Sequence, residues 1–201
     1  FTMDKGLSVA VKKVFVELYK KKIIYKDQRL INWDPKLQTA ISDLEVDQRE
    51  VNSKLYHIKY PIEGSSDFIT ITTTRPETML GDTAVAVNPK DHRYQHLIGK
   101  EIELPLCSRN IPIIADDYVD QEFGSGCVKI TPGHDFNDFQ LGKRHELDVI
   151  NIFTKDAKLN SNVTKEFVGL DRFKAREIVI QKMESLGFLE QIEDYNLIIP
   201  R

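Results

Sequence analysis

The chain has 201 residues, 28 of them Lys or Arg and 31 Asp or Glu, which gives a formal net charge of −3. This length suits one domain with an appendage, and a hydrophobic content of 41% is too high for a disordered chain. Two cysteines cannot build a disulfide framework or a cysteine-rich zinc site, and the near-neutral charge lacks the strongly basic signature of a nucleic-acid-binding domain.

The first expected element is a helix over residues 8–22. Ser8 is a candidate N-cap, apolar side chains recur at helical spacing, and lysines 20–22 suit the negative end of the helix dipole. We interpret the lysine run as a solvated helix end, with an RNA contact as the alternative.

The two ends of the sequence carry no targeting signal. Residues 1–6 do not resemble a signal peptide, and no apolar run is long enough to span a bilayer. We therefore expect a cytoplasmic protein with no membrane partner. The chain starts on helix-like sequence and stops at Ile199-Pro200-Arg201, which we interpret as a piece of a longer protein.

The sequence after residue 30 has the pattern of a β-rich core. Residues 30–60 alternate weakly, which predicts short strands, and residues 63–66 have the composition of a linker. Runs rich in β-branched residues, separated by Gly, Pro, Asn and Asp, predict further strands. These strands span residues 68–74, 83–87, 101–106, 110–115 and 127–131. Their number and spacing favour a closed or nearly closed barrel over a parallel sheet.

Two helices are expected after the strands. Asp135 opens the first, which ends near His145. The second runs from Asp171 to Leu186, with Ala175, Val179, Met183 and Leu186 on one face and Gly187 as its stop. The expected fold class is therefore mixed α/β and β-rich, with peripheral helices.

Several common catalytic motifs are absent from the sequence. There is no phosphate-binding loop, no Gly-x-Ser-x-Gly and no His-Glu-x-x-His. Gly124-Ser125-Gly126 lacks the third glycine of a dinucleotide fingerprint. We therefore expect neither a metal ion nor a cofactor in the chemistry of this chain.

The first candidate site is the threonine-rich strip at residues 72–74, followed by Arg75. Threonine is a good strand former, so the strip has a structural interpretation. Alternatively, its short, stiff hydroxyl groups form a polar lip that binds a ligand or orients water. Arg75 and Glu77 fit either a surface ion pair or contacts to an anionic ligand.

The second candidate site is the corner where the strand ending at Thr131 turns into a helix. Lys129 and Thr131 share one face of the strand, and Asp135 and Asp138 lie one helical turn apart. Asp135 fits an N-cap as well as a ligand, and Asp138 fits a first-turn acid. The convergence of these groups predicts a polar pocket for a small amine-bearing substrate. His134 could act as a general base, but the sequence shows no partner for it, which favours a structural role.

At these two sites the sequence resembles the editing domain of bacterial-type valyl-tRNA synthetases, which belong to class I. The likeness is carried by residues 73–89, which contain Arg-Pro-Glu-Thr and Gly-Asp-Thr, and by residues 124–145. The flanks at residues 32–46 and 199–201 are also similar, so the likeness covers nearly the whole chain. The synthetic-site signatures His-Ile-Gly-His and Lys-Met-Ser-Lys-Ser are missing.

The resemblance implies a division of the chain and an activity. Residues 49–195 would form an inserted β-barrel editing domain, residues 1–48 a helical and linker segment that roots it in a catalytic domain, and residues 196–201 the exit strand. The implied reaction is hydrolysis of threonyl-tRNA with a valine anticodon, and also of threonyl-adenylate, without aminoacylation. ATP would serve only the full-length synthetase. The implied partners are the threonine-carrying 3′ acceptor end of tRNA(Val) and the rest of the synthetase in cis, in a monomeric enzyme.

The resemblance also implies roles for individual residues. Asp138 would hold the substrate ammonium, and Lys129, Thr131 and Asp135 would contact the amino acid. The side chains implied to line the pocket near the terminal adenosine are Thr72, Thr73, Thr74, Arg75 and Phe123. Of all these residues, Asp138, Thr73 and Thr74 are expected to serve catalysis.

The chain departs from its family at a zinc position. Many members carry cysteines around Asn-Trp-x-Pro that could bind zinc, whereas Asp34 and Leu37 stand there in this chain. We therefore expect no zinc site.

Two alternative functions remain open at this point. One is editing of valyl-tRNA, as in the isoleucyl relatives, and the other is a non-catalytic module that positions the tRNA acceptor end. Deacylation of threonyl-tRNA and valyl-tRNA, measured side by side, distinguishes all three.

Overall fold

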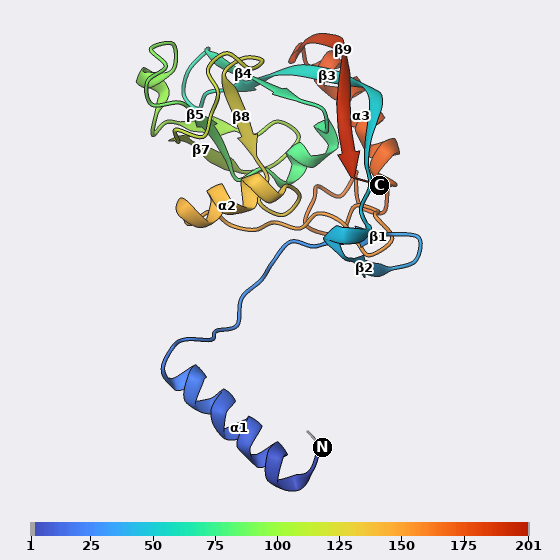
Figure 1. Cartoon of the computed structure of the whole chain (residues 1–201). Helices are drawn as coiled ribbons and strands as arrows, with labels where there is room; N and C mark the ends of the chain where they lie inside the picture. The colour runs from blue at the N-terminus through green and yellow to red at the C-terminus, as the bar shows by residue number, and fades with distance from the viewer. Residues whose placement is uncertain (1–2, 201) are drawn as a thin grey trace.

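The protein has a β-rich body with helices at its periphery, shown by the computed structural model in Figure 1. The structure describes residues 3–200, so Arg201 at the end of the predicted exit strand lies outside the described residues, as do residues 1 and 2. The helices are α1 (Lys5–Lys20), α2 (Phe136–Arg144) and α3 (Arg172–Ser185), with short 3₁₀ helices η1 (Asp43–Glu45), η2 (Pro76–Gly81) and η3 (Gln95–Leu97). The strands are β1 (Asn32–Asp34), β2 (Thr39–Ile41), β3 (Gln48–Pro61), β4 (Phe68–Thr73), β5 (Ala84–Val87), β6 (Glu101–Glu103), β7 (Asn110–Ala115), β8 (Cys127–Ile130) and β9 (Leu189–Pro200). The predicted β-rich α/β fold is confirmed.

The longest strand pairing joins β3 to β9. The two strands are antiparallel from the pair Gln48–Pro200 to the pair Ile58–Leu189, and β3 pairs with β4 along its other edge. The prediction of only short strands over residues 30–60 is wrong for β3. Its first half has no buried residue, so no alternation of apolar and polar side chains reveals it, and it is held by a partner far along the sequence. The boundary predicted at residue 196 falls inside β9, and the division of the chain into segments stays a prediction.

A second, four-stranded sheet has the order β6-β7-β5-β8. Its central strand β5 is buried on both faces and is entirely apolar, as expected of a strand covered on both sides. β5 and β7 run parallel and the other pairs run antiparallel, so the sheet is mixed. The sequence analysis did not predict this parallel pair.

The two sheets curve around a common core. A bridge between Ile62 and Ile102 links the end of β3 to β6, and β8 lies beside β4. Among the described residues the ladders form three sheets: these two and the small sheet β1-β2. The arrangement brings the end of β4 next to the end of β8, and therefore brings the two candidate sites together.

Helix α3 covers one side of this core. It buries Ala175, Val179 and Met183, as the sequence predicts. Leu186 is instead the C-cap and is 52% exposed. Gly187 follows with a φ of +72°, the left-handed conformation that ends a helix.

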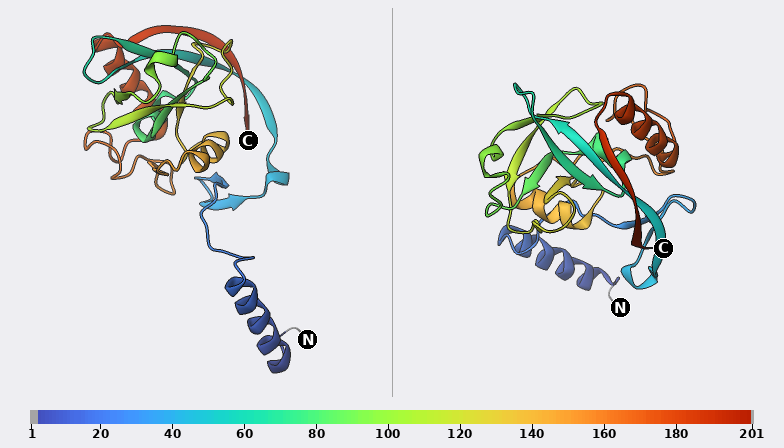
Figure 2. Two further views of the ribbon diagram at one scale, coloured as in Figure 1. Left: turned by 90° about the vertical axis from the view of Figure 1, so that its left-hand side faces the viewer. Right: turned by 90° about the horizontal axis from the view of Figure 1, so that it is seen from above.

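Helix α1 stands away from the body on an extended segment (Figures 1 and 2). It begins at Lys5 with Asp4 at the N-cap position, so the predicted start at Ser8 is wrong, and Ser8 lies within the helix. None of the residues of α1 is buried, and Val11, Val14 and Phe15 are exposed. Within residues 3–200, no helix combines the length and apolarity needed to cross a bilayer.

Candidate functional site

Strand β4 carries the threonine strip to the rim of a cavity. The strand ends at Thr73 because Pro76 cannot continue a ladder and instead starts η2. Two side chains fix the turn: Thr73 Oγ1 accepts a hydrogen bond from Arg75 N at 3.1 Å, and Thr78 Oγ1 donates to Arg75 O at 2.9 Å. The hydroxyl proton of Thr73 stays available to the cavity. The hydroxyl of Thr74 has no hydrogen-bond partner among the described residues.

Arg75 and Glu77 do not form an ion pair with each other, which removes one of the two alternatives for them. Arg75 Nη1 donates to the carbonyl oxygen of His134 at 2.8 Å, which ties the threonine strip to the opposite corner. Glu77 is only 1% exposed and accepts two hydrogen bonds from Arg176, at 2.7 and 2.8 Å. The ion pair is absent because η2 turns Glu77 away from Arg75 and toward Arg176 of α3.

The corner between β8 and α2 is fixed by Asp135. Its Oδ1 accepts hydrogen bonds from Asn137 N at 2.8 Å and Asp138 N at 3.2 Å. The N-cap interpretation of Asp135 is therefore confirmed, and the residue also lines the cavity.

Asp138 lies in the first turn of α2 and folds back onto β8. Its Oδ2 accepts a hydrogen bond from Thr131 N at 2.9 Å. Burial raises the pKa of the Asp138 carboxyl to about 7; the nearby carboxylates of Asp135 and Asp82 raise it further, while Lys129 and Thr131 N oppose the rise. The carboxylate is thus desolvated and has no lysine or arginine bonded to it among the described residues, which suits it to bind a cation from outside.

A buried acid that the sequence analysis did not assign lies behind this corner. Asp82 Oδ1 accepts hydrogen bonds from Lys129 Nζ at 2.9 Å and Thr131 Oγ1 at 2.6 Å, and its Oδ2 accepts one from Tyr60 at 2.8 Å. Lys129 also donates to Thr131 Oγ1. Burial raises the pKa of Asp82, against the opposing effects of Lys129, Thr131 and Tyr60. The signal in the sequence was an acid inside segment 79–87, in which the only other polar side chain is Thr83.

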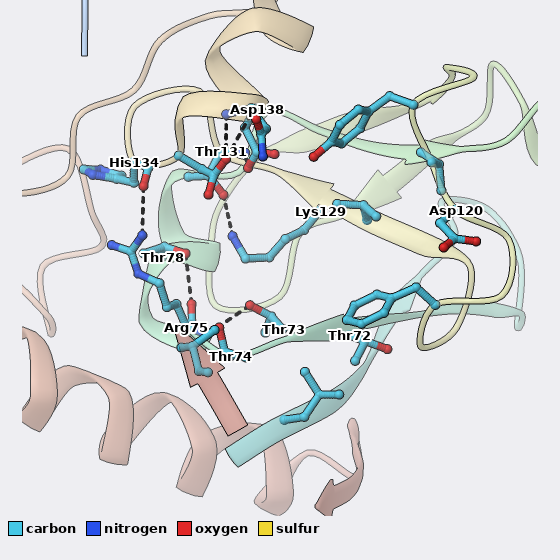
Figure 3. A pocket seen from close by; sticks show the side chains of 18 of the residues that line it. Thr72, Thr73, Thr74, Arg75, Thr78, Asp120, Lys129, Thr131, His134 and Asp138 are labelled. Atoms are coloured by element: carbon cyan, nitrogen blue, oxygen red, sulfur yellow. Dashed lines mark hydrogen bonds between the residues drawn. The ribbon is translucent and has the colours of Figure 1, made fainter. Parts of the chain in front are cut away.

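All nine side chains predicted for the site line one cavity of about 470 Å³. They come from β4 and the turn after it, from the loop before β8, and from the segment that runs from β8 into the first turn of α2. Those that Figure 3 labels point toward one another. The nine are Thr72, Thr73, Thr74, Arg75, Phe123, Lys129, Thr131, Asp135 and Asp138. Their roles stay predictions.

The cavity has further walls that the motifs did not include. Strands β3 and β9 contribute Leu55, Tyr195 and Leu197, and the loop after β7 contributes Tyr118 and Asp120. Leu55, Tyr195 and Leu197 are far from the motifs in sequence, so only the strand pairing brings them to the site.

His134 has a structural setting. Its Nε2 accepts a hydrogen bond from Ile152 N at 2.9 Å, and its ring packs edge-on against Phe153 with centroids 4.7 Å apart. Burial, reinforced by the charges of Arg75 and Lys129, lowers the pKa of His134 to about 3. The ring is therefore neutral and its Nε2 is already used, which favours the structural role over that of a general base.

The position where relatives carry cysteines is a hairpin turn here. Asp34 Oδ1 accepts hydrogen bonds from Lys36 N at 2.7 Å and Leu37 N at 3.1 Å, which closes the turn between β1 and β2. Within residues 3–200, no three His, Cys, Asp or Glu side chains are grouped to hold a metal ion.

Comparison with known proteins gives matches over nearly the whole chain. The family described as tRNA synthetases class I (I, L, M and V) matches residues 1–196. The chain is 60% identical over 200 residues to the valine–tRNA ligases of Pelagibacter ubique and Francisella tularensis, and 59% identical over 201 residues to that of Legionella pneumophila strain Lens. Each alignment covers 100% of this chain but only 22–23% of the relative, so the chain spans less than a quarter of their length.

Two solved structures share the fold. A ternary complex of leucyl-tRNA synthetase (agnB2 LeuRS), tRNA and LeuAMS from Agrobacterium radiobacter K84 matches with a TM-score of 0.53 and 19% identity, over 98% of this chain and 33% of that one. GlLeuRS-CP1 matches with a TM-score of 0.55 and 12% identity, over 69% of this chain and 98% of that one. These matches confirm the resemblance drawn from the sequence.

Proposed function

Because the chain belongs to the class I tRNA synthetase family of the isoleucyl, leucyl, methionyl and valyl type, we propose that its cavity proofreads mischarged tRNA. In this proposal the cavity hydrolyses the ester of threonyl-tRNA(Val), as part of a longer valine–tRNA ligase that supplies the ATP-dependent synthesis and most of the tRNA contacts. The observation that carries the proposal is the convergence of a desolvated carboxylate, a lysine and a strip of threonines in one cavity of about 470 Å³.

The need for such a site follows from the chemistry of the two amino acids. Threonine and valine have the same shape, and the established discrimination of a hydrophobic valine pocket against threonine is only about 10²-fold. A second site must therefore demand the hydroxyl group that the first site could not exclude.

Two groups in the cavity can recognise threonine. The Asp138 carboxylate would bind the α-ammonium. Lys129 uses two of its three N–H donors on Asp82 and Thr131, so the third would bind the γ-hydroxyl of threonine. Valine would leave this donor desolvated and unpaired, at a cost of about 1–3 kcal/mol. The buried Asp82 keeps Lys129 in place and balances its charge.

Hydrolysis in this proposal uses a positioned water rather than a protein nucleophile. The water oxygen attacks the ester carbonyl carbon, the bond to the ribose oxygen breaks, and that oxygen takes up a proton, which gives threonine and uncharged tRNA. The free hydroxyl protons of Thr73 and Thr74 would stabilise the developing oxyanion, and orientation supplies much of the remaining effect. The same geometry would act on threonyl-adenylate. Asp138, paired with the ammonium, would not serve as the base.

Deacylation of threonyl-tRNA(Val) and valyl-tRNA(Val), measured side by side with a full-length ligase that carries this segment, tests the proposal. Threonyl-tRNA is expected to be hydrolysed and valyl-tRNA to be spared. Asp138→Ala should abolish hydrolysis while circular dichroism shows an intact fold. Preferential hydrolysis of valyl-tRNA would reassign the substrate, and tRNA binding with no hydrolysis of either ester would leave only a positioning module.

A further inference from the structure

The loop at residues 116–126 forms one side of the cavity without belonging to a helix or strand. It contributes Asp120 and the half-exposed Phe123 to the lining. The Phe123 ring meets Tyr195 of β9 edge-on, with centroids 6.4 Å apart. The position of this loop therefore decides the shape of the cavity on that side.

A chain of three hydrogen bonds holds this loop to the outer face of the three-stranded sheet. Ser125 N donates to Thr72 Oγ1 at 3.2 Å, Thr72 Oγ1 meets His57 Nδ1 at 3.4 Å, and His57 Nε2 meets Glu193 Oε1 at 2.6 Å. We name these four residues the loop latch. They come from the loop, β4, β3 and β9, in spatial order.

The direction of these bonds follows from the chemistry of the end group. An ionised carboxylate only accepts hydrogen bonds, so His57 Nε2 carries the proton and Nδ1 is an acceptor when the ring is neutral. Thr72 then donates its proton to Nδ1, which leaves its oxygen as the acceptor for Ser125 N. The His57–Glu193 pair thus fixes Thr72 in the orientation that receives the loop.

Close packing at Gly124 supports the same contact independently. A Cβ atom built on Gly124 would lie 2.9 Å from Thr72 Oγ1 and 3.0 Å from Thr72 Cβ, and the φ of Gly124 is +56°. Only glycine lets the backbone of the loop approach Thr72 this closely without strain.

We infer that His57 and Glu193 are positioning residues for substrate binding, because through Thr72 they seat the loop that carries Phe123 against the cavity. The inference rests on the proposed function, since the bound group would be the aminoacylated end of tRNA. Neither His57 nor Glu193 lines the cavity, so both act through Thr72.

The same sheet provides a matched control. Thr70 lies two residues before Thr72 on the same face of β4, and its Oγ1 donates to Glu190 of β9 at 2.9 Å. This bond also links β4 to β9, but Thr70 does not line the cavity and does not touch the loop. A merely structural link would make the two threonines equivalent.

The first experiment measures threonyl-tRNA deacylation by a full-length ligase that carries this segment. Thr72→Val and His57→Ala are each expected to raise KM by about threefold to tenfold, the effect of losing one hydrogen bond, with kcat little changed. The double variant should be no worse than either single variant. His57→Asn should restore KM, because its amide oxygen reaches the place of Nδ1. Gly124→Ala should raise KM. The control variant Thr70→Val should leave KM unchanged.

The second experiment measures amide hydrogen exchange at Ser125 in the 201-residue chain, without tRNA. Exchange is expected to speed up in Thr72→Val and His57→Ala and to stay unchanged in Thr70→Val. Wild-type KM and exchange in His57→Ala, or equal effects at Thr70 and Thr72, would overturn the inference. A wild-type ligase that hydrolyses neither ester overturns the proposed function and the binding role with it, whereas exchange at Ser125 still decides whether the latch exists.

Discussion

Asp138 combines two properties that oppose each other at the level of a single residue. Its burial makes the carboxylate a strong binder of an ammonium group, because water does not compete, and the same burial makes the ionised form costly in the free protein. The pKa of about 7 records that cost. A site built for binding is in this sense less stable than the same corner with a neutral side chain.

This opposition predicts the effect of Asp138→Asn on stability. Because the carboxyl has an ordinary pKa of 3.8 and a pKa of about 7 in the folded protein, the folded state binds more protons between about pH 4 and 7, and its stability falls as pH rises through that range. The asparagine variant does not titrate and can still accept from Thr131 N. Its free energy of unfolding at pH 8 should exceed that of the wild type by up to about 4 kcal/mol, with little difference at pH 4. Urea titrations at both pH values measure this, and equal stability at pH 8 would contradict the raised pKa.

Lys129 carries a second prediction at this scale. Its partner Asp82 is fully buried, so Lys129→Ala leaves an uncompensated carboxylate and should destabilise the fold by about 3–5 kcal/mol. Lost threonine selectivity in that variant would therefore be ambiguous. Lys129→Met combined with Asp82→Asn removes both charges and should recover most of the stability, so selectivity is best measured there. Denaturant unfolding of both variants checks this, and a single variant within 1 kcal/mol of wild type would show that Asp82 is not ionised.

Sequence motifs identified nine side chains that line one cavity, and they missed the residue behind it. The nine predicted side chains lie in two continuous stretches plus Phe123. Residues of one motif are neighbours in the sequence, so they can be recognised without knowledge of the fold. Asp82 lies inside the motif of residues 73–89, yet its role depends on Lys129 and Tyr60, which β5 pairing and the core bring to it. Tyr195 and Leu55 were invisible for the same reason, since only the β3–β9 pairing places them.

At the level of elements, the local signals of α2 and α3 were read correctly, whereas the start of α1 and the long-range pairings were not. Asp135 and Asp171 cap α2 and α3 with their own side chains, and a cap is a property of four or five consecutive residues. β3 and β9 instead stabilise each other across the chain, and the exposed part of β3 has no periodicity to recognise. The parallel pairing of β5 and β7 was missed because a parallel neighbour is decided by the crossover between the strands.

The contact between α3 and η2 predicts a coupling between a peripheral helix and the cavity. Arg176 on α3 forms two hydrogen bonds to the buried Glu77, which lies directly after the threonine strip. Arg176→Ala should destabilise the protein by about 2–4 kcal/mol and reduce threonyl-tRNA hydrolysis, because η2 loses its anchor. Arg176→Met combined with Glu77→Gln is the control and should regain stability. Thermal unfolding and deacylation are the measurements, and a single variant as stable as the wild type would show that η2 is held by other contacts.

At the level of the whole molecule, α1 contributes nothing to the core. It has no buried residue, its hydrogen bonds are internal, and the connection to the body runs through an extended segment. Removal of residues 1–24 should therefore change the unfolding temperature of the remaining chain by less than about 2 °C. Calorimetry of the full and shortened chains tests this. A larger loss would mean that α1 packs against the body in solution.

The β3–β9 pairing has a consequence for how such a unit can be carried by a host protein. Gln48 and Pro200 are direct partners across an antiparallel ladder, so the chain enters and leaves this body at points about 5 Å apart. The two ends of this span of about 150 residues are therefore as close together as the ends of a tight hairpin. A host fold that carries the span in place of a surface turn loses almost no additional conformational entropy on closing it. The whole unit can therefore be added, exchanged or deleted at a surface turn of a host fold, with two adjacent strands as its connection.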